Sequence, residues 1–217
     1  MLDIETMREY IENKQYAKIR SEIVEMNEAD IAAMLEELEL PGKELIQVFR
    51  MLPKTIAADV FSFLSIELEQ TIITMLTDRE AATIIDNLFA DDAADLMEEM
   101  PANVVKRLLA QTTPETRRDI NHLLQYPEDS AGSIMTVEFV LLKEDYTVAQ
   151  AIERIRKVGI DKETINTCYV TNQYRKIKGT ISLRMLLLSN TSDRIGDLME
   201  ENVITISTLM DQEEVSR

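Results

Sequence analysis

Residues 124–132 read Leu124-Gln125-Tyr126-Pro127-Glu128-Asp129-Ser130-Ala131-Gly132, and this stretch separates two parts of different character. Proline, acidic residues, serine and glycine in close succession are typical of a turn or linker. Before it, apolar residues recur with helical spacing. After it, short runs with strand character begin. The sequence therefore predicts two domains that meet near residue 128.

Residues 1–127 are predicted to form short helices almost throughout. Breakers or capping residues recur about every twelve positions, and Thr113-Pro114-Glu115 is a typical helix start. The apolar residues with i, i+3, i+4 spacing are Ile56, Val60, Phe63, Leu64, Ile72, Met75, Leu76, Ile84, Ile85 and Leu88. Short amphipathic helices in series predict a stacked helical superhelix, and an irregular helical bundle is the alternative.

A weak internal echo supports the superhelix. The pattern of Asp, Ala, Ala, Leu and Glu in residues 30–37 returns in residues 91–98, at an offset of 61.

Residues 129–192 predict a small α/β module with the order β-α-β-β-α. A capping box from Thr147 to Gln150 opens its first helix. The expected elements are a strand at 137–142, a helix at 148–158, strands at 167–171 and around 177–182, and a helix from about Leu183.

The pattern of this module begins again near its end. Met135, Val140 and Leu142 match Met199, Ile204 and Ile206 at an offset of 64. We therefore assign residues 193–217 to the start of a truncated second module. A helix cut in its second turn cannot bury its face. Either the natural protein is longer, or residues 195–217 pack on something else.

The charge of the chain excludes several functions. It has 23 Lys and Arg against 40 Asp and Glu, a net charge of −17, and residues 1–130 carry −15 of it. Binding to nucleic acid or to an anionic membrane surface needs basic residues. No apolar run is longer than five residues, and such runs, residues 185–188 among them, are too short to span a membrane.

The reactive side chains do not indicate an enzyme. The single Cys168 is expected to be buried and structural, and the single His122 to lie at the surface. No Gly-rich phosphate loop or nucleophile–base pair is visible.

The acidic run at residues 91–99 is the main candidate site. Asp91, Asp95 and Glu98 share one helix face, which can be an ordinary solvated face or a divalent-cation site. Carboxylates about 4 Å apart repel by roughly 4 kcal/mol at an effective dielectric of about 20. A cation could therefore close an acidic interface that charge otherwise holds open, which is the behaviour of a switch.

Several segments resemble the cytosolic part of MgtE-type magnesium transporters. They are residues 125–136, 161–166, 179–184 and 211–215, with Pro53-Lys54, residues 57–60 and residues 91–95 in the helical part. The resemblance implies a right-handed superhelical N domain at 1–128, a cystathionine-β-synthase (CBS) module at 129–192, and a partial second CBS module at 193–217.

The resemblance also implies a function and a set of ligands. The chain would be the cytosolic Mg²⁺-sensing regulatory region of a homodimeric transporter, on the cytoplasmic face of the membrane. Mg²⁺ held between the N domain and the CBS module would favour the closed state of a transmembrane pore that this chain lacks. By similarity, the Mg²⁺ ligands are Asp59, Asp91, Asp95, the Gly132 carbonyl and Asp211.

One position departs from a pattern found in nucleotide-binding CBS modules. Where those modules often carry an Asp that holds the ribose hydroxyls, this chain has Met185. A thioether accepts hydrogen bonds poorly, so ATP binding is doubtful. The alternative function is a helical-repeat adaptor for protein partners, with a CBS-like module that senses a nucleotide.

Overall fold

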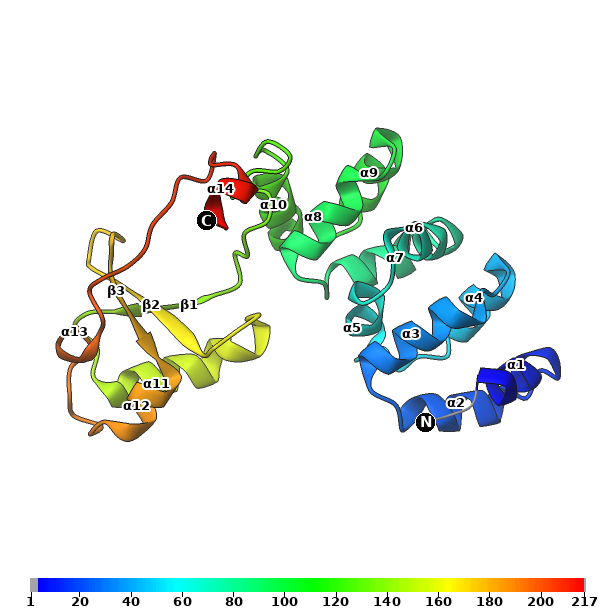
Figure 1. Cartoon of the computed structure of the whole chain (residues 1–217), viewed down its shortest axis with the longest axis horizontal. Helices are drawn as coiled ribbons and strands as arrows, with labels where there is room; N and C mark the ends of the chain where they lie inside the picture. Colours follow the sequence, from blue (N-terminus) through cyan, green and yellow to red (C-terminus); the bar gives the residue numbers. More distant parts are fainter. Residues whose placement is uncertain (1–3, 217) are drawn as a thin grey trace. The chain divides into compact units, whose positions relative to one another are not determined.

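The computed structural model describes residues 4–216, which fall into two compact units that divide between Leu124 and Gln125. The first unit is all helical, and the second contains a three-stranded sheet (Figure 1). We describe each unit by itself.

The described residues of the first unit, from Ile4 on, form ten helices, and all of them are short, as the spacing of breakers predicts. Their bounds are α1 Ile4–Glu12, α2 Tyr16–Val24, α3 Glu28–Leu38, α4 Gly42–Phe49, α5 Ala57–Ser62, α6 Ile66–Met75, α7 Asp78–Ile85, α8 Ala90–Glu98, α9 Ala102–Leu109 and α10 Pro114–Leu123.

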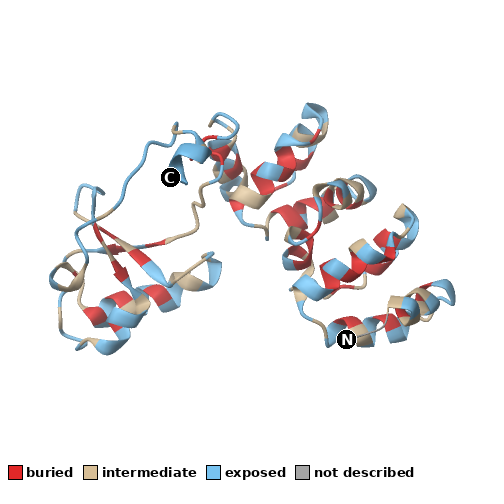
Figure 2. Ribbon diagram, in the orientation of Figure 1, coloured by how far each residue is buried: buried red, intermediate tan, exposed pale blue. Residues whose placement is uncertain are grey.

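These helices stack in two interleaved rows. In one row α1, α3, α5, α7 and α9 pack each on the next, and in the other α4, α6, α8 and α10 do the same. Each helix of these two rows thus packs against a helix two places along the chain, whereas α2 packs on α1. Buried residues recur along the helices of this unit (Figure 2). This regular stacking is that of a helical superhelix.

Two details of the sequence-based picture are wrong. The echo at an offset of 61 joins α3 with α8, which belong to different rows, so it does not follow the structural repeat. Phe63, assigned to an apolar stripe, is 59% exposed because it lies just beyond the end of α5.

The capping residues explain where several helices begin. Thr77 and Glu80 form a capping box at the start of α7, and the Thr113 hydroxyl accepts from the backbone N–H of Thr116 in α10. Ser65 precedes α6 without a side-chain cap, and its backbone N–H donates to the Glu36 carboxylate, at 2.6 Å.

The second unit has the expected β-α-β-β-α order. Its elements are β1 Val140–Lys143, α11 Val148–Val158, the 3-10 helix η1 Gly159–Asp161, β2 Thr167–Thr171, β3 Ile177–Ser182, α12 Leu183–Leu188, α13 Ile195–Leu198 and α14 Gln212–Val215. Strand β1 starts three residues later than the expected Val137. It runs parallel to β2 through the α11 crossover, and β2 pairs antiparallel with β3.

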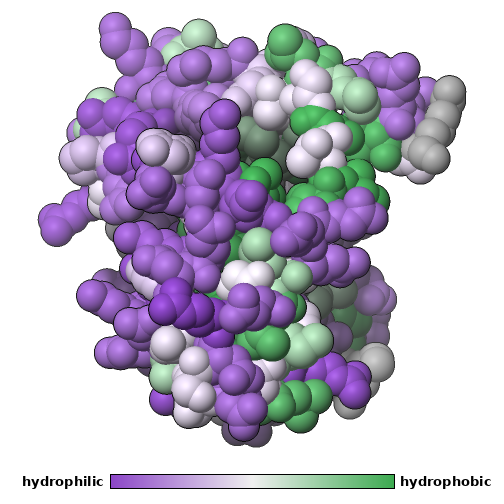
Figure 3. Space-filling view, turned by 90° about the vertical axis from the view of Figure 1, so that its left-hand side faces the viewer, coloured by the Kyte–Doolittle hydropathy of each residue, from purple (hydrophilic) through white to green (hydrophobic). Residues whose placement is uncertain are grey.

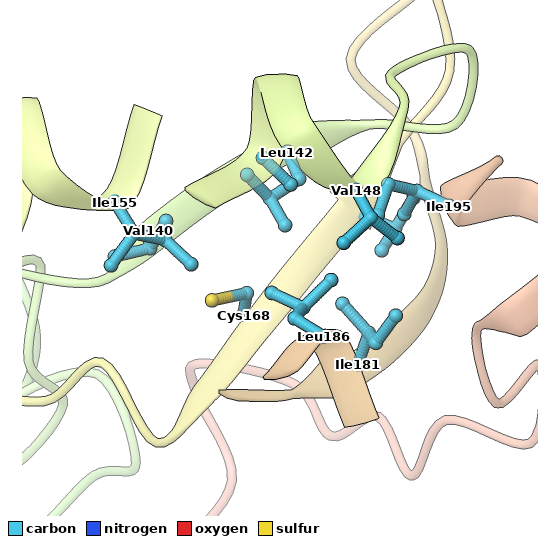
Figure 4. Close-up of a cluster of buried hydrophobic side chains, with 10 residues drawn as sticks. Val140, Leu142, Val148, Ile155, Cys168, Ile181, Leu186 and Ile195 are labelled. Carbon is cyan, nitrogen blue, oxygen red and sulfur yellow. The ribbon is translucent and has the colours of Figure 1, made fainter. Parts of the chain in front are cut away.

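Alternating residues of the three strands build the core of this unit. Val140 and Leu142 from β1, Cys168 and Val170 from β2, and Ile181 from β3 are buried together. Figure 4 shows the side chains of Val140, Leu142, Cys168 and Ile181 converging on one cluster with those of Val148, Ile155 and Leu186 from the helices.

Residues 195–212 pack on the same unit. Ile195 is fully buried in the sheet core, and Leu198 and Met199 pack against it. Farther along, Thr208 and Met210 accept hydrogen bonds from the backbone of residues 131–132. Residues 195–199 and 208–212 therefore pack on the unit to which they belong. Helix α14 itself buries no residue.

Candidate functional site

Helix α8 carries the acidic run of the sequence. Its inner face is formed by Ala93, Leu96 and Met97, which are buried. Asp91 and Asp92 lie in its first turn, where the helix dipole stabilises negative charge. The apolar face fixes the helix against its neighbours, which leaves Asp91 and Asp92 partly buried and Asp95 and Glu98 exposed.

Helix α6 adds a fourth carboxylate that the sequence-based prediction missed. Glu69 is only 9% exposed, and α6 packs on α8. Burial raises the pKa of Glu69 to about 8, with smaller contributions from the charges of Asp92 and Asp95. Its position was a usable signal, because Glu69 precedes the buried Ile72 and Ile73 by three and four residues and so lies on the apolar face of α6.

The pKa of Asp95 is raised by the same two causes, burial and a neighbouring carboxylate. Desolvation raises its pKa, and the charge of Asp91 one turn earlier raises it further. The side chains of Glu69, Asp91, Asp92 and Asp95 are therefore an acidic cluster, which we name the α6–α8 cluster. A nearby cation would relieve this repulsion, whereas the free carboxylates disfavour one another's ionisation.

Asp59 lies outside the α6–α8 cluster as defined. It is exposed on α5, and α5 packs on α3 and α7. Within residues 4–216 no three His, Cys, Asp or Glu side chains are gathered closely enough to hold a metal ion by themselves. Asp59, Asp91 and Asp95 thus remain predicted ligands.

Gly132 and Asp211 lie close together in the second unit, although they are 79 positions apart. The backbone N–H of Gly132 donates to the Thr208 carbonyl at 2.8 Å, and Ser130 forms an isolated antiparallel bridge with Asp211. In the described part of the chain, no backbone N–H donates to the Gly132 carbonyl. One Asp211 oxygen accepts from the backbone N–H of Glu213, at 2.8 Å, and caps α14.

Glycine is required at position 132 for steric reasons. A Cβ atom there would lie 2.5 Å from the Tyr126 ring and 2.9 Å from the Thr208 carbonyl oxygen. The backbone of residues 208–212 can approach this closely only because position 132 has no side chain.

The remaining candidates behave as structural or surface residues. Cys168 is buried in the sheet core, and burial raises its pKa to about 11, so the thiol is unreactive. His122 is exposed on α10, and Met185 is 46% exposed on α12.

The described residues contain no helix that is both long and apolar enough to cross a membrane. Apolar side chains do reach the surface: Figure 3 shows hydrophobic residues among hydrophilic ones on one face of the molecule. The most exposed of them in the second unit are Ile160, Tyr174, Leu187, Leu188, Ile204 and Leu209.

Comparison with protein families matches both units. Residues 2–129 match the model of the MgtE intracellular N domain, and residues 131–189 match that of the CBS domain.

Curated relatives and solved structures agree with these matches. The magnesium transporter MgtE of Thermus thermophilus is 32% identical over 216 residues, covering 98% of this chain and 47% of the relative. That of Bacillus subtilis is 30% identical over 198 residues, covering 91% of this chain and 44% of the relative. The chain thus spans about half the length of these relatives.

Two crystal structures have the same fold. One is the cytosolic domain of the Mg²⁺ channel MgtE in complex with ATP, with a TM-score of 0.89 and 32% identity over 99% of this chain and 87% of that one. The other is the soluble part of a magnesium transporter, with a TM-score of 0.86 and 25% identity over 99% of this chain and 85% of that one.

Proposed function

The chain belongs to the MgtE family, as its N domain and CBS domain, and from this premise we propose that it senses Mg²⁺ and regulates a magnesium transporter. In this proposal, transport through the membrane is carried out by the transmembrane pore of the full-length transporter. The region acts by binding and shape change rather than by catalysis.

The observation that carries this proposal is the α6–α8 cluster. Burial raises the pKa of Glu69 to about 8, with smaller contributions from the charges of Asp92 and Asp95, and desolvation together with the charge of Asp91 raises the pKa of Asp95. Such crowding is unfavourable without a cation and favours the binding of a hard divalent ion. The donors are all oxygens, which is the ligand chemistry that Mg²⁺ prefers over nitrogen or sulfur.

The proposed ligands come from both units. Asp59, Asp91 and Asp95 would supply carboxylates from the N domain. Gly132 would supply a backbone carbonyl, and Asp211 a carboxylate, from the segments that lie together in the second unit. Mg²⁺ keeps several water ligands, so one or two protein oxygens per ion are sufficient.

The proposed mechanism is a charge-controlled switch. Without Mg²⁺, repulsion between carboxylates favours an extended arrangement of the N domain and the CBS module. With Mg²⁺, bound ions join the two units, favour a compact state and close the pore. A full population swing needs a difference of about 5.5 kcal/mol in Mg²⁺ binding between the states, which several weak sites together can supply.

We further propose that the chain functions as a homodimer on the cytoplasmic face of the membrane, attached to the transmembrane domain of the transporter. The exposed apolar side chains of the second unit, Leu187 and Leu188 among them, support a contact between copies there.

ATP is a second ligand to consider, because the related cytosolic domain was crystallised with it. In this chain the side chain at position 185 is a thioether, which cannot replace an Asp as an acceptor for two ribose hydroxyls. We propose that ATP binds weakly here, and nothing favours the adaptor function over Mg²⁺ sensing.

The test is Mg²⁺-induced compaction, measured by small-angle X-ray scattering on the whole chain. The variant Asp91→Ala with Asp95→Ala should unfold at the temperature of the parent or slightly above, and should need at least about tenfold more Mg²⁺ to compact.

The matched control is Asp30→Ala with Glu37→Ala, which removes the same charge from exposed positions of α3. It should compact like the parent. If the α8 variant also compacts at the parent's Mg²⁺ concentration, the assignment of these ligands is wrong.

A further inference from the structure

Two short segments of the second unit hold each other through backbone hydrogen bonds. Residues 129–132 follow the last helix of the N domain, and residues 208–212 lie near the end of the chain. The N–H of Ala131 donates to the Met210 carbonyl at 2.7 Å, and the N–H of Gly132 donates to Thr208. We call this pair of segments the clasp.

One side-chain contact closes the end of the clasp. The Gln212 Nε2 donates to the Asp129 Oδ1 at 2.7 Å, and the Gln212 backbone N–H donates to the Asp129 carbonyl at 2.8 Å. Asp129 has a φ of 60°, in the left-handed region, where the chain turns from Pro127 into the clasp. Asp and Asn adopt this conformation more readily than most residues.

The clasp sets the position of two groups that matter here. Gly132 lies three residues after Asp129, and Asp211 immediately precedes Gln212. Ser130 faces Asp211 across the clasp. Asp129 and Gln212 therefore flank the bridge between Ser130 and Asp211. Their hydrogen bonds fix how the segment with the Gly132 carbonyl is aligned with the segment that carries Asp211.

We infer that Asp129 and Gln212 are positioning residues, which hold the Gly132 carbonyl and the Asp211 carboxylate in the register that Mg²⁺ binding requires. This inference rests on the proposed function. Asp129 is an acidic residue beside the proposed ligands. In this inference its carboxylate accepts a hydrogen bond from Gln212 and does not ligate the ion.

Reversal of the hydrogen bond gives a sharp test. Asp129→Ala and Gln212→Ala each remove it. Gln212→Glu places two carboxylates together and breaks it by repulsion. In Asp129→Asn with Gln212→Glu, the new amide can donate to the new carboxylate, with the same total charge as the parent.

Two measurements on the whole chain separate the possible roles. Hydrogen exchange of the peptide 126–136, followed by mass spectrometry, reports on the clasp itself. The midpoint of Mg²⁺-dependent thermal stabilisation, at constant ionic strength, reports on Mg²⁺ binding. The two Ala variants and Gln212→Glu should exchange faster at Ala131 and Gly132 and raise the Mg²⁺ midpoint about fivefold, the equivalent of one net hydrogen bond. The reversed pair should restore both values.

Each other outcome overturns part of the argument. Unchanged exchange in the single variants would show that the clasp does not depend on this pair. Faster exchange with an unchanged Mg²⁺ midpoint would show a structural role only. A parent that Mg²⁺ does not stabilise would overturn the proposed function and the positioning role with it. A responsive parent with an unrestored reversed pair would show that the hydrogen bond between positions 129 and 212 does not set the Mg²⁺ midpoint, and would refute positioning alone.

Discussion

Arg50 and Glu80 join helices three apart in the superhelix through a two-pronged ion pair. The Arg50 Nε and Nη2 donate to the two oxygens of Glu80, at 3.0 and 2.9 Å. Arg50 follows α4, and Glu80 also completes the capping box of α7 with Thr77. The hydrogen bonds from Arg50 and Thr77 lower the pKa of Glu80 to about 2.

This pair predicts an acid-dependent loss of stability. Because the folded pKa of Glu80 lies below its ordinary value of 4.5, its contribution is complete above pH 4.5 and is lost as the pH falls toward 2. Both side chains are over 40% exposed, so solvent screens the pair and Glu80→Gln should cost only about 1 kcal/mol at pH 6. Urea unfolding at pH 6, 4 and 2.5 should show this difference shrinking as the pH falls. A difference that stays constant to pH 2.5 would contradict the role of the ionised carboxylate.

The contact between Glu36 and the start of α6 predicts a second, position-specific effect. Glu36 accepts from the backbone N–H of Ser65, one of the groups at a helix start that have no partner inside the helix. Glu36→Ala should lower the free energy of unfolding by about 1 kcal/mol. Glu37→Ala, at the next and exposed position, should change it by less than about 0.5 kcal/mol. Equal losses in the two variants would mean that helix α3 itself, and not the contact, is affected.

Glu69→Gln should stabilise the N domain in metal-free buffer at pH 8. In the parent the folded state binds a proton at Glu69 that the unfolded state has released, so stability falls as the pH rises from about 4.5 to about 8. The amide removes this penalty, and the gain at pH 8 should be at least about 1.4 kcal/mol, the equivalent of one pH unit. At pH 5 the two proteins should differ much less. Thermal unfolding at both pH values measures this, and Glu67→Gln, on the exposed side of α6, is the control.

Gly132→Ala should open the clasp. The new methyl group would collide with the Tyr126 ring and the Thr208 carbonyl oxygen, and overpacking of this kind costs about 1–3 kcal/mol. Gly42→Ala, at the start of α4, is the control, because its methyl group would meet only the flexible end of the Met75 side chain. Denaturant unfolding should show the second unit destabilised by the first change and the N domain nearly unaffected by the second.

Met185→Asp should strengthen ATP binding if the thioether is what weakens it. Two recovered hydrogen bonds are worth about a tenfold gain in affinity, measured by calorimetric titration. Leu188→Asp adds the same charge at an exposed position of α12 and should not strengthen binding. Tight binding of ATP by the parent would refute our reading of position 185.

Local signals in the sequence were sufficient for most of the secondary structure. The capping box at Thr147 places the start of α11, and Pro114 after Thr113 places the start of α10. Strand β1 was the least well placed, because residues 137–139 have strand-forming side chains but no ladder partner for their backbone. Pairing depends on what lies opposite, which no local pattern contains.

Local sequence patterns predict only part of the candidate site. Asp91 and Asp95 lie one turn apart, so their crowding follows from helical spacing. Glu69 joins them only because α6 packs on α8. The one signal of this in the sequence is that Glu69 lies on the apolar face of α6.

By itself, the sequence determined two parts, the helical character of the first, the β-α-β-β-α order of the second, and a concentration of negative charge in the first part. These properties depend on periodicity, caps and composition, which act over a few residues. Tertiary structure decided that alternate helices stack in rows, that Glu69 meets Asp92 and Asp95, and that Asp129 pairs with Gln212, 83 positions away. Such contacts depend on how folded elements meet in space, because burial and hydrogen bonding select partners by geometry and not by distance along the chain.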